Sequence, residues 1–204
     1  MTFLELCQRL RQEVGAAGNG PANVASQSGE YARFVTYVAT SWFELQNERR
    51  WAFDWARGEV ELTALDTEYS LPSDFDVWDS ETLQFAGERI EVVPWHYLDK
   101  GVAGTFGRVA IAPDGVLHLN APPDNEGGLT FEYWRTPQEL VENTDQPRMP
   151  SRFHMCVVYR AMMQYALYEN AQEVAQQAGR NSLRIENRLM ESQLPHIELP
   201  PSLA

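Results

Sequence analysis

Hydrophobic positions near the start of the chain recur every three or four residues, which is the spacing of one-sided α-helices. Thr2 and Glu5 have the spacing of a capping box, and Gly15 follows the last apolar position as a helix stop. The small and polar residues up to Gly29 predict a loop, and a long second helix is expected to begin near Ser28. The apolar faces of these two helices are Phe3, Leu6, Leu10 and Val14, and Tyr31, Phe34, Val35, Val38, Trp42 and Leu45.

The far end of the second helix is rich in large rings and guanidinium groups. One interpretation is that the rings form the seam between this helix and the sheet that follows. The other is a surface for a partner, since Trp and Arg are enriched at interface hot spots. The segment contains Arg49, Arg50, Trp51, Phe53 and Trp55.

The pattern changes from helical to alternating after Gly58, which predicts half-buried strands. Turn residues such as Gly87 and Pro113-Asp114-Gly115 indicate tight hairpins between these strands. The predicted elements are a hairpin of 82–85 with 89–93, a hairpin of 109–112 with 116–119, a helical turn within 94–100, and a last strand over 129–134.

Helical spacing returns after a proline-rich stretch and predicts one long helix from about Ser151 to Gln193, which Gly179 bends or interrupts. The expected fold class is α+β: a helical bundle of two N-terminal helices and a long C-terminal helix, with a central antiparallel β insertion. The expected parts are a helical body of 1–57 and 150–193, a β insertion over 58–137, a linker over 138–149, and an extended C-terminal tail over 194–204.

Composition and charge narrow the range of functions. The 204 residues are 44% hydrophobic and carry a net charge of −13, which disfavours ordinary nucleic-acid binding. No apolar run reaches the roughly 18 residues of a membrane helix, and the first residues lack a secretory signal, so synthesis in the cytoplasm and no membrane partner are expected. Lys100 is the only lysine. The preference for Arg suits bidentate contacts between subunits, although codon usage explains it equally well.

Motifs for catalysis or metal binding are missing from the sequence. His154 and Cys156 lie two residues apart on a predicted helix, so they point in different directions and are interpreted as packing residues. Asp74, Asp76 and Asp79 lack the glycine and glutamate of a calcium loop and are assigned to a turn. We therefore expect no catalytic residue, no cofactor and no metal.

The order of elements and several local stretches point to a known family: Phe3–Leu10 with Gly15–Gly20, Trp42 with Arg50–Phe53, Tyr69–Phe75, and Met149–His154. In these features the chain resembles the head-to-tail adaptor proteins of tailed bacteriophages, the ring-forming connectors of the tail tubular protein A and head-completion types. The resemblance extends over most of the chain. It rests on the order of the elements and on these short sequence stretches, and not on an active-site signature.

The resemblance implies a structural protein of the virion neck that is not an enzyme. Such proteins form a ring, commonly of twelve copies, under the portal protein, bind the next tail or nozzle protein, and let genomic DNA pass without specific binding. The implied portal-docking residues are Leu194, Pro195, Ile197, Leu199 and Pro200. The candidate subunit-interface residues are Arg49, Arg50, Trp51, Trp55, Arg184 and Arg188.

Two alternatives remain open. The first is a tail-associated carbohydrate-binding or hydrolase module, in which Trp78, Trp95 and Trp134 would stack on sugar rings. Exposed tryptophans clustered beside two carboxylates would favour it, whereas tryptophans packed inside the fold would not. The second is another virion ring, such as a tail terminator.

Overall fold

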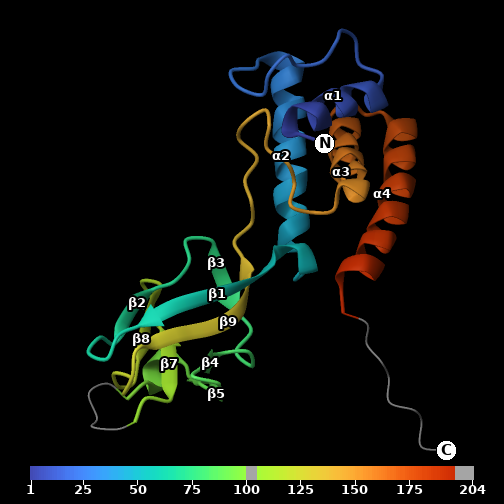
Figure 1. Ribbon diagram of the computed structural model, residues 1–204. Helices are drawn as coiled ribbons and strands as arrows, with labels where there is room; N and C mark the ends of the chain where they lie inside the picture. Colours follow the sequence, from blue (N-terminus) through green and yellow to red (C-terminus); the bar gives the residue numbers. More distant parts are fainter. Residues whose placement is uncertain (100–104, 196–204) are drawn as a thin grey trace, which may run out of the picture. The chain divides into compact units, whose positions relative to one another are not determined.

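The chain divides into two compact units, one built of helices and one of strands (Figure 1). A computed structural model describes residues 1–99 and 105–195. The helical unit comprises Met1–Asp54 and the chain from Pro137 onward, and the β unit comprises Trp55–Thr136. The α+β class is therefore confirmed. The helical unit contains α1 (Phe3–Val14), α2 (Gly29–Asn47), α3 (Met155–Tyr168) and α4 (Gln172–Gln193), with the short 3-10 turns Ala52–Asp54 and Ser151–Phe153.

The first helix has the caps that its sequence predicts. The Thr2 hydroxyl accepts a hydrogen bond from the Glu5 backbone nitrogen at 3.3 Å, and the Glu5 carboxylate accepts one from the Thr2 nitrogen at 2.8 Å. Gly15 follows the last residue of α1 with a φ of 69°, a left-handed conformation that costs glycine little. Both ends of α1 are therefore set by local chemistry.

The single long C-terminal helix of the prediction is wrong, because the structure has two helices in its place. The break falls at Asn170, whose φ is 54°, and not at Gly179, which lies inside α4. The Ala171 nitrogen donates to the Ala166 carbonyl at 2.9 Å, the six-to-one bond of a Schellman C-cap. Asparagine supplies the left-handed residue here because its short polar side chain tolerates that conformation.

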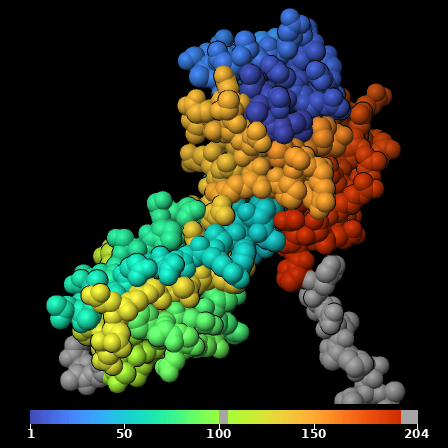
Figure 2. Space-filling view, in the orientation of Figure 1, coloured from blue at the N-terminus to red at the C-terminus, as the bar shows by residue number. Residues whose placement is uncertain are grey.

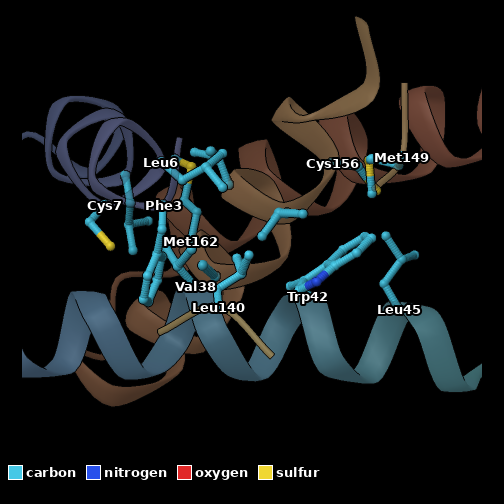
Figure 3. Close-up of a cluster of buried hydrophobic side chains, with 14 of the residues drawn as sticks. Phe3, Leu6, Cys7, Val38, Trp42, Leu45, Leu140, Met149, Cys156 and Met162 are labelled. Atoms are coloured by element: carbon cyan, nitrogen blue, oxygen red, sulfur yellow. The ribbon is translucent and has the colours of Figure 1, made fainter. Parts of the chain in front are cut away.

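Helix α3 lies at the centre of the helical unit, since it packs against α1, α2 and α4. Figure 3 shows the apolar side chains that meet there, with Phe3 and Leu6 from α1, Val38 and Trp42 from α2, and Met162 from α3. None of the five is more than 2% exposed. Each such burial contributes about 1.5–3 kcal/mol relative to an exposed side chain, so this core is what holds the helices together.

The segment expected to be a linker, 138–149, has no helix or strand but packs on the helical unit. Two of its side chains, Leu140 and Met149, are buried in the helical core. The Gln46 side chain fixes its start, accepting from the Gln138 nitrogen at 2.7 Å and donating to the Gln138 carbonyl at 3.0 Å. Its backbone polar groups are therefore partly satisfied by α2.

The β unit contains two sheets with a shared apolar core. One sheet has the order β1-β9-β4-β5, with β3 also paired to β9, and the other has the order β2-β8-β7-β6. The core includes Leu62, Leu83, Val109, Leu117 and Leu129, which come from both sheets and the segments between them. The strands are β1 (Trp55–Leu62), β2 (Glu68–Ser70), β3 (Phe75–Trp78), β4 (Gln84–Phe85), β5 (Glu88–Arg89), β6 (Glu91–Val92), β7 (Arg108–Ile111), β8 (Val116–Leu119) and β9 (Gly127–Arg135).

The predicted hairpin of 109–112 with 116–119 is confirmed, whereas that of 82–85 with 89–93 is confirmed only around its turn, because its second arm is divided between β5 and β6 of different sheets. The β unit is also not purely antiparallel. In the first hairpin Phe85 pairs with Glu88, and Ala86 and Gly87 make the two-residue turn with φ of 51° and 83°. Strands β7 and β8 form the second hairpin. Strand β6, however, pairs parallel with β7, which requires a crossover connection that local turn signals do not reveal. The 3-10 turn Trp95–Tyr97 lies in that connection, where one helical turn was predicted.

Gly58 on β1 offers a test of how tightly the β core is packed. It pairs in register with Phe131 on β9, and a Cβ atom at position 58 would lie 2.6 Å from the Phe131 ring. We expect Gly58→Ala to lower the free energy of unfolding of the β unit by about 1–3 kcal/mol, because the ring must move. Gly107→Ala is the matched control, since a Cβ there would meet no atom within 4 Å. Calorimetry of the full chain measures both, and equal stability of the two variants would contradict the expected clash.

Candidate interaction surfaces

His154 and Cys156 are packing residues, as predicted. The His154 Nδ1 atom lies 2.6 Å from the amino group of Met1, and its Nε2 atom lies 3.1 Å from the Met149 carbonyl oxygen. Burial lowers the pKa of His154, and the positive charge of the Met1 amino group lowers it further. Burial also raises the pKa of the Cys156 thiol to about 12, so this thiol is protonated at neutral pH and is a poor nucleophile.

In the acidic turn of the β unit, the carboxylates of Asp74 and Asp79 interact with nearby groups of the fold. Asp74 accepts a hydrogen bond from the Tyr133 hydroxyl at 2.8 Å and lies 3.7 Å from the Arg135 guanidinium. Asp79 accepts from the Glu81 nitrogen at 3.1 Å. Within residues 1–99 and 105–195, no three His, Cys, Asp or Glu side chains are grouped in a way that could hold a metal ion. In the same residues, no helix combines the length and the apolar character needed to cross a membrane.

The three tryptophans considered for sugar binding do not share one exposed surface. Trp78 is 9% exposed and belongs to the core of the β unit. It pairs in register with Tyr133, so the next residue along β9, Trp134, points to the opposite face of the sheet. Trp95 is half-buried, with its ring 4.7 Å from that of His118. Trp78, Trp95 and Trp134 therefore do not form one exposed cluster.

A polar hollow on the β unit is the place where the sugar-binding alternative can be examined. It has a volume of about 650 Å³, and three carboxylates line it without a tryptophan in the lining. One of them, Glu132, forms an ion pair with Arg57 at 3.3 Å. No tryptophan is in its lining, but Trp55 lies beside it: this side chain is 37% exposed, places its Nε1 atom 3.3 Å from Glu132, and pairs in register with Trp134. The lining acids are Glu59, Glu81 and Glu132.

The predicted interface tryptophans have different environments in the structure. Trp51 is 1% exposed, stacks on Phe53 with a centroid distance of 5.7 Å, and donates from Nε1 to the Leu45 carbonyl at 2.7 Å. Its ring serves the helical core and is not free to meet a neighbouring copy. Trp55 begins β1 in the other unit and is 37% exposed. Trp51 is therefore a buried residue of the fold, whereas Trp55 keeps an exposed ring that a partner can contact.

The predicted portal-docking segment begins where α4 ends. Leu194 follows the last residue of α4 and packs against the helical core, and Pro195 is exposed. Both lie at the end of the part of the chain that the structure describes. The other predicted docking residues, Ile197, Leu199 and Pro200, lie outside the described residues.

The exposed face of α4 carries three arginines at intervals of four residues, which we call the arginine stripe: Arg180, Arg184 and Arg188. None of them forms an ion pair with a residue that the structure describes, although Arg180 Nε lies 3.4 Å from the Gln176 carbonyl. Figure 2 shows α4 at the surface of the helical unit. Arg180 was not in the predicted interface, although its spacing of four from Arg184 is a signal that the sequence contains. Arg49 and Arg50, just after α2, are also exposed.

The side of α2 that faces away from the core also has an apolar and acidic surface. Phe43 on this side of α2 is 46% exposed. A second exposed apolar side chain, Leu183, lies beside the arginine stripe on α4 and is 62% exposed. Phe43 borders a hollow of about 410 Å³, which we call the α2 hollow. Glu44 in its lining forms no ion pair with any described residue. The α2 hollow is lined by Phe43, Glu44, Asn47 and Glu48.

An ionic cluster connects α2, α3 and α4. Arg160 on α3 donates two hydrogen bonds to Glu48, from Nη1 at 2.5 Å and Nη2 at 2.8 Å, and one from Nε to Glu186 on α4 at 2.8 Å. Ser182 donates to the same Glu186 oxygen at 2.5 Å. Burial by itself would raise the pKa of Glu186, but the hydrogen bonds from Arg160 and Ser182 outweigh it and lower that pKa. The cluster therefore holds a charged carboxylate at the junction of three helices.

Comparison with known proteins places the chain in a family. The family model described as SU10 adaptor protein matches residues 1–195. No curated protein matches the chain. This is a family of structural bacteriophage adaptors and not of enzymes, so the resemblance to head-to-tail adaptors is confirmed at the level of the family. The narrower tail tubular protein A or head-completion type stays a prediction.

Proposed function

Because the chain belongs to the SU10 adaptor protein family, we propose that it forms a ring, commonly of twelve copies, beneath the portal and joins the capsid to the tail. The observation that carries this proposal is the family match over residues 1–195, which includes sequence from both units. In this role the chain is a structural protein of the virion neck without a catalytic step. Its proposed partners are other copies of itself, the portal protein, and the next tail or nozzle protein.

The charge of the chain supports a passive role toward DNA. Asp and Glu outnumber Lys and Arg by 29 to 16. A ring of such subunits repels the phosphate backbone over most of its surface, because binding along DNA depends on neutralising phosphates with cations. Genomic DNA is therefore proposed to pass through the channel of the ring without specific binding.

The chain after α4 is proposed to dock on the portal. Leu194 and Pro195 would start this segment, and Ile197 and Leu199 would be its apolar anchors. Pro195 and Pro200 disfavour continuation of the helix, so the segment suits binding in an extended form. Ordering on a partner would then supply the apolar contacts that this segment needs.

The test is assembly with the portal protein of the same phage, followed by electron microscopy and mass photometry. A closed ring of this chain on the portal ring is the expected result. A variant that ends at Pro195 should keep its helical circular dichroism spectrum but lose portal binding. If the full chain stays a monomer and never binds the portal, the proposed function is wrong.

A further inference from the structure

We propose that neighbouring copies in the ring associate head to tail, with the arginine stripe and Leu183 of one copy on the α2 hollow of the next. This inference rests on the proposed function, because it names the two surfaces through which that ring would close. The two surfaces are different, as a ring whose subunits are related by rotation alone requires: each subunit uses one surface toward one neighbour and another surface toward the other.

The arrangement of the helical unit keeps the two surfaces apart. Helix α3 packs against both α2 and α4, and Figure 1 shows α3 between them. On α2, Val38 and Trp42 point to the core, whereas Phe43 and Asn47 lie on the opposite side of the helix. The outer face of α2 and the exposed face of α4 are therefore different surfaces, although they approach each other at one point: Glu48 of the α2 hollow and Glu186 of α4 both bind Arg160. One copy can use both at the same time.

The two surfaces have complementary charge. The arginine stripe places three guanidinium groups on one helix of a chain with a net charge of −13, and none is paired with a described residue. On the α2 hollow, Glu44 offers a carboxylate that is also unpaired among those residues. Glu48 beside it is already bound to Arg160. Arg184 opposite Glu44 would satisfy both charges, and a guanidinium can bind a carboxylate through two hydrogen bonds.

The apolar groups of the two surfaces also fit together. Leu183 is 62% exposed beside Arg184, and Phe43 is 46% exposed at the α2 hollow. The α2 hollow is a shallow, open surface, so Leu183 would pack on the Phe43 ring there. An aromatic residue and an arginine at the centre of a contact are typical of interface hot spots. The contact would therefore combine apolar burial at its centre with ion pairs around it.

A protein partner fits the stripe better than DNA does. Glu173 precedes Arg180 by seven residues, and Glu191 follows Arg184 by seven, so both acids lie on the same side of α4 as the stripe. Both are exposed. A phosphate backbone along this face would meet these carboxylates as well as the arginines, and the exposed Leu183 would gain nothing from it. A surface of mixed charge with an apolar side chain is typical of protein contacts.

Charge reversal tests the pairing. Arg184→Glu and Glu44→Arg are each expected to weaken ring assembly on the portal by about tenfold or more, because each puts like charges opposite one another. The double variant, which exchanges the two charges, should recover assembly to near the wild-type level. Arg89→Glu, on an exposed position of β5, is the matched control and should assemble normally. Circular dichroism confirms that each variant is folded, which these exposed positions allow.

The outcomes separate the pairing from the proposed function. If wild-type rings form and both single reversals assemble normally, or the double variant does not recover, the pairing is wrong while the adaptor function stands. If Arg184→Glu leaves ring closure unchanged but reduces retention on heparin, the stripe faces a phosphate polymer and the pairing is also wrong. Failure of the wild-type chain to bind the portal at all overturns the proposed function itself.

Discussion

Replacing Trp51 with alanine is expected to lower the free energy of unfolding of the helical unit by about 3–5 kcal/mol, the usual cost of deleting a buried tryptophan. The ring is 1% exposed and stacks on Phe53 at an interplanar angle of 11°. Its Nε1 group also donates to the Leu45 carbonyl, one of the last carbonyls of α2. The variant would lose a large apolar surface and leave a polar group near the end of a helix with one partner fewer.

Trp55→Ala is the matched control for this prediction, since it removes the same side chain four residues later. Trp55 is 37% exposed, and its Nε1 group lies 3.3 Å from a Glu132 oxygen at the surface of the β unit. We expect a loss of at most about 1 kcal/mol, as for most surface substitutions. Chemical denaturation followed by circular dichroism measures both variants. A stable Trp51→Ala protein that fails to form rings would instead identify Trp51 as an interface residue.

The elements that could be predicted from the sequence are those whose signals are local. The cap formed by Thr2 and Glu5 and the turn at Ala86 and Gly87 each depend on a few adjacent residues, and both are present in the structure. Such signals act within one turn of the chain, so no knowledge of the rest of the fold is needed. The alternation that predicts β9 is of the same kind.

The features that sequence reasoning missed depend on contacts between distant parts of the chain or on weak local signals. Gly179 is a stronger helix breaker than Asn170, yet α3 ends at Tyr168, because the αL residue Asn170 and the bond from Ala171 to Ala166 cap the helix there. The parallel pairing of β6 with β7 joins residues that are 17 positions apart in the chain, Glu91 with Arg108 and Val92 with Val109. Neither choice follows from propensity alone.

For the candidate surfaces, too, local features can be predicted from the sequence and features set by long-range contacts cannot. The spacing of the arginine stripe can be read from the sequence, because an interval of four residues places side chains on one helix face. The unpaired state of Glu44 cannot, since it depends on which side of α2 packs against α3. The difference in burial between Trp51 and Trp55 depends on the boundary between the two units, which lies between Asp54 and Trp55. Composition alone treats the two tryptophans as one cluster.

Replacing Arg160 with methionine is expected to lower the free energy of unfolding of the helical unit by about 3 kcal/mol, as when one partner is removed from a buried ion pair. Methionine keeps the apolar stem of the side chain, so the loss reports the charge. The Arg160 side chain is 13% exposed and that of Glu186 is 22% exposed. Without the guanidinium, Glu186 would keep only the hydrogen bond from Ser182 among the contacts described above.

Arg9→Met is the control for this prediction. Arg9 forms an ion pair with Glu13 on α1 with 46% of its side chain exposed, and such a pair contributes about 0.5 kcal/mol or less. A replacement of Arg160 and Glu186 together, by methionine and leucine, should recover part of the stability, because no unpaired charge is then buried. Equal losses in Arg9→Met and Arg160→Met would show that the cluster adds no more than a surface pair.

The pH dependence of the Arg160→Met variant should separate lost charge pairing from lost packing. In the wild type the pKa of Glu186 lies below its ordinary value of 4.5, so the contribution of this group is present above that pH and is lost as the pH falls through the lowered value. In the variant burial dominates and the pKa of Glu186 rises, so protonation relieves the buried charge. The stability difference between the two proteins should therefore shrink as the pH falls from 7 toward 4, measured by urea denaturation. A difference that stays constant over this range would mean that the variant lost packing around α3 and not the neutralisation of Glu186.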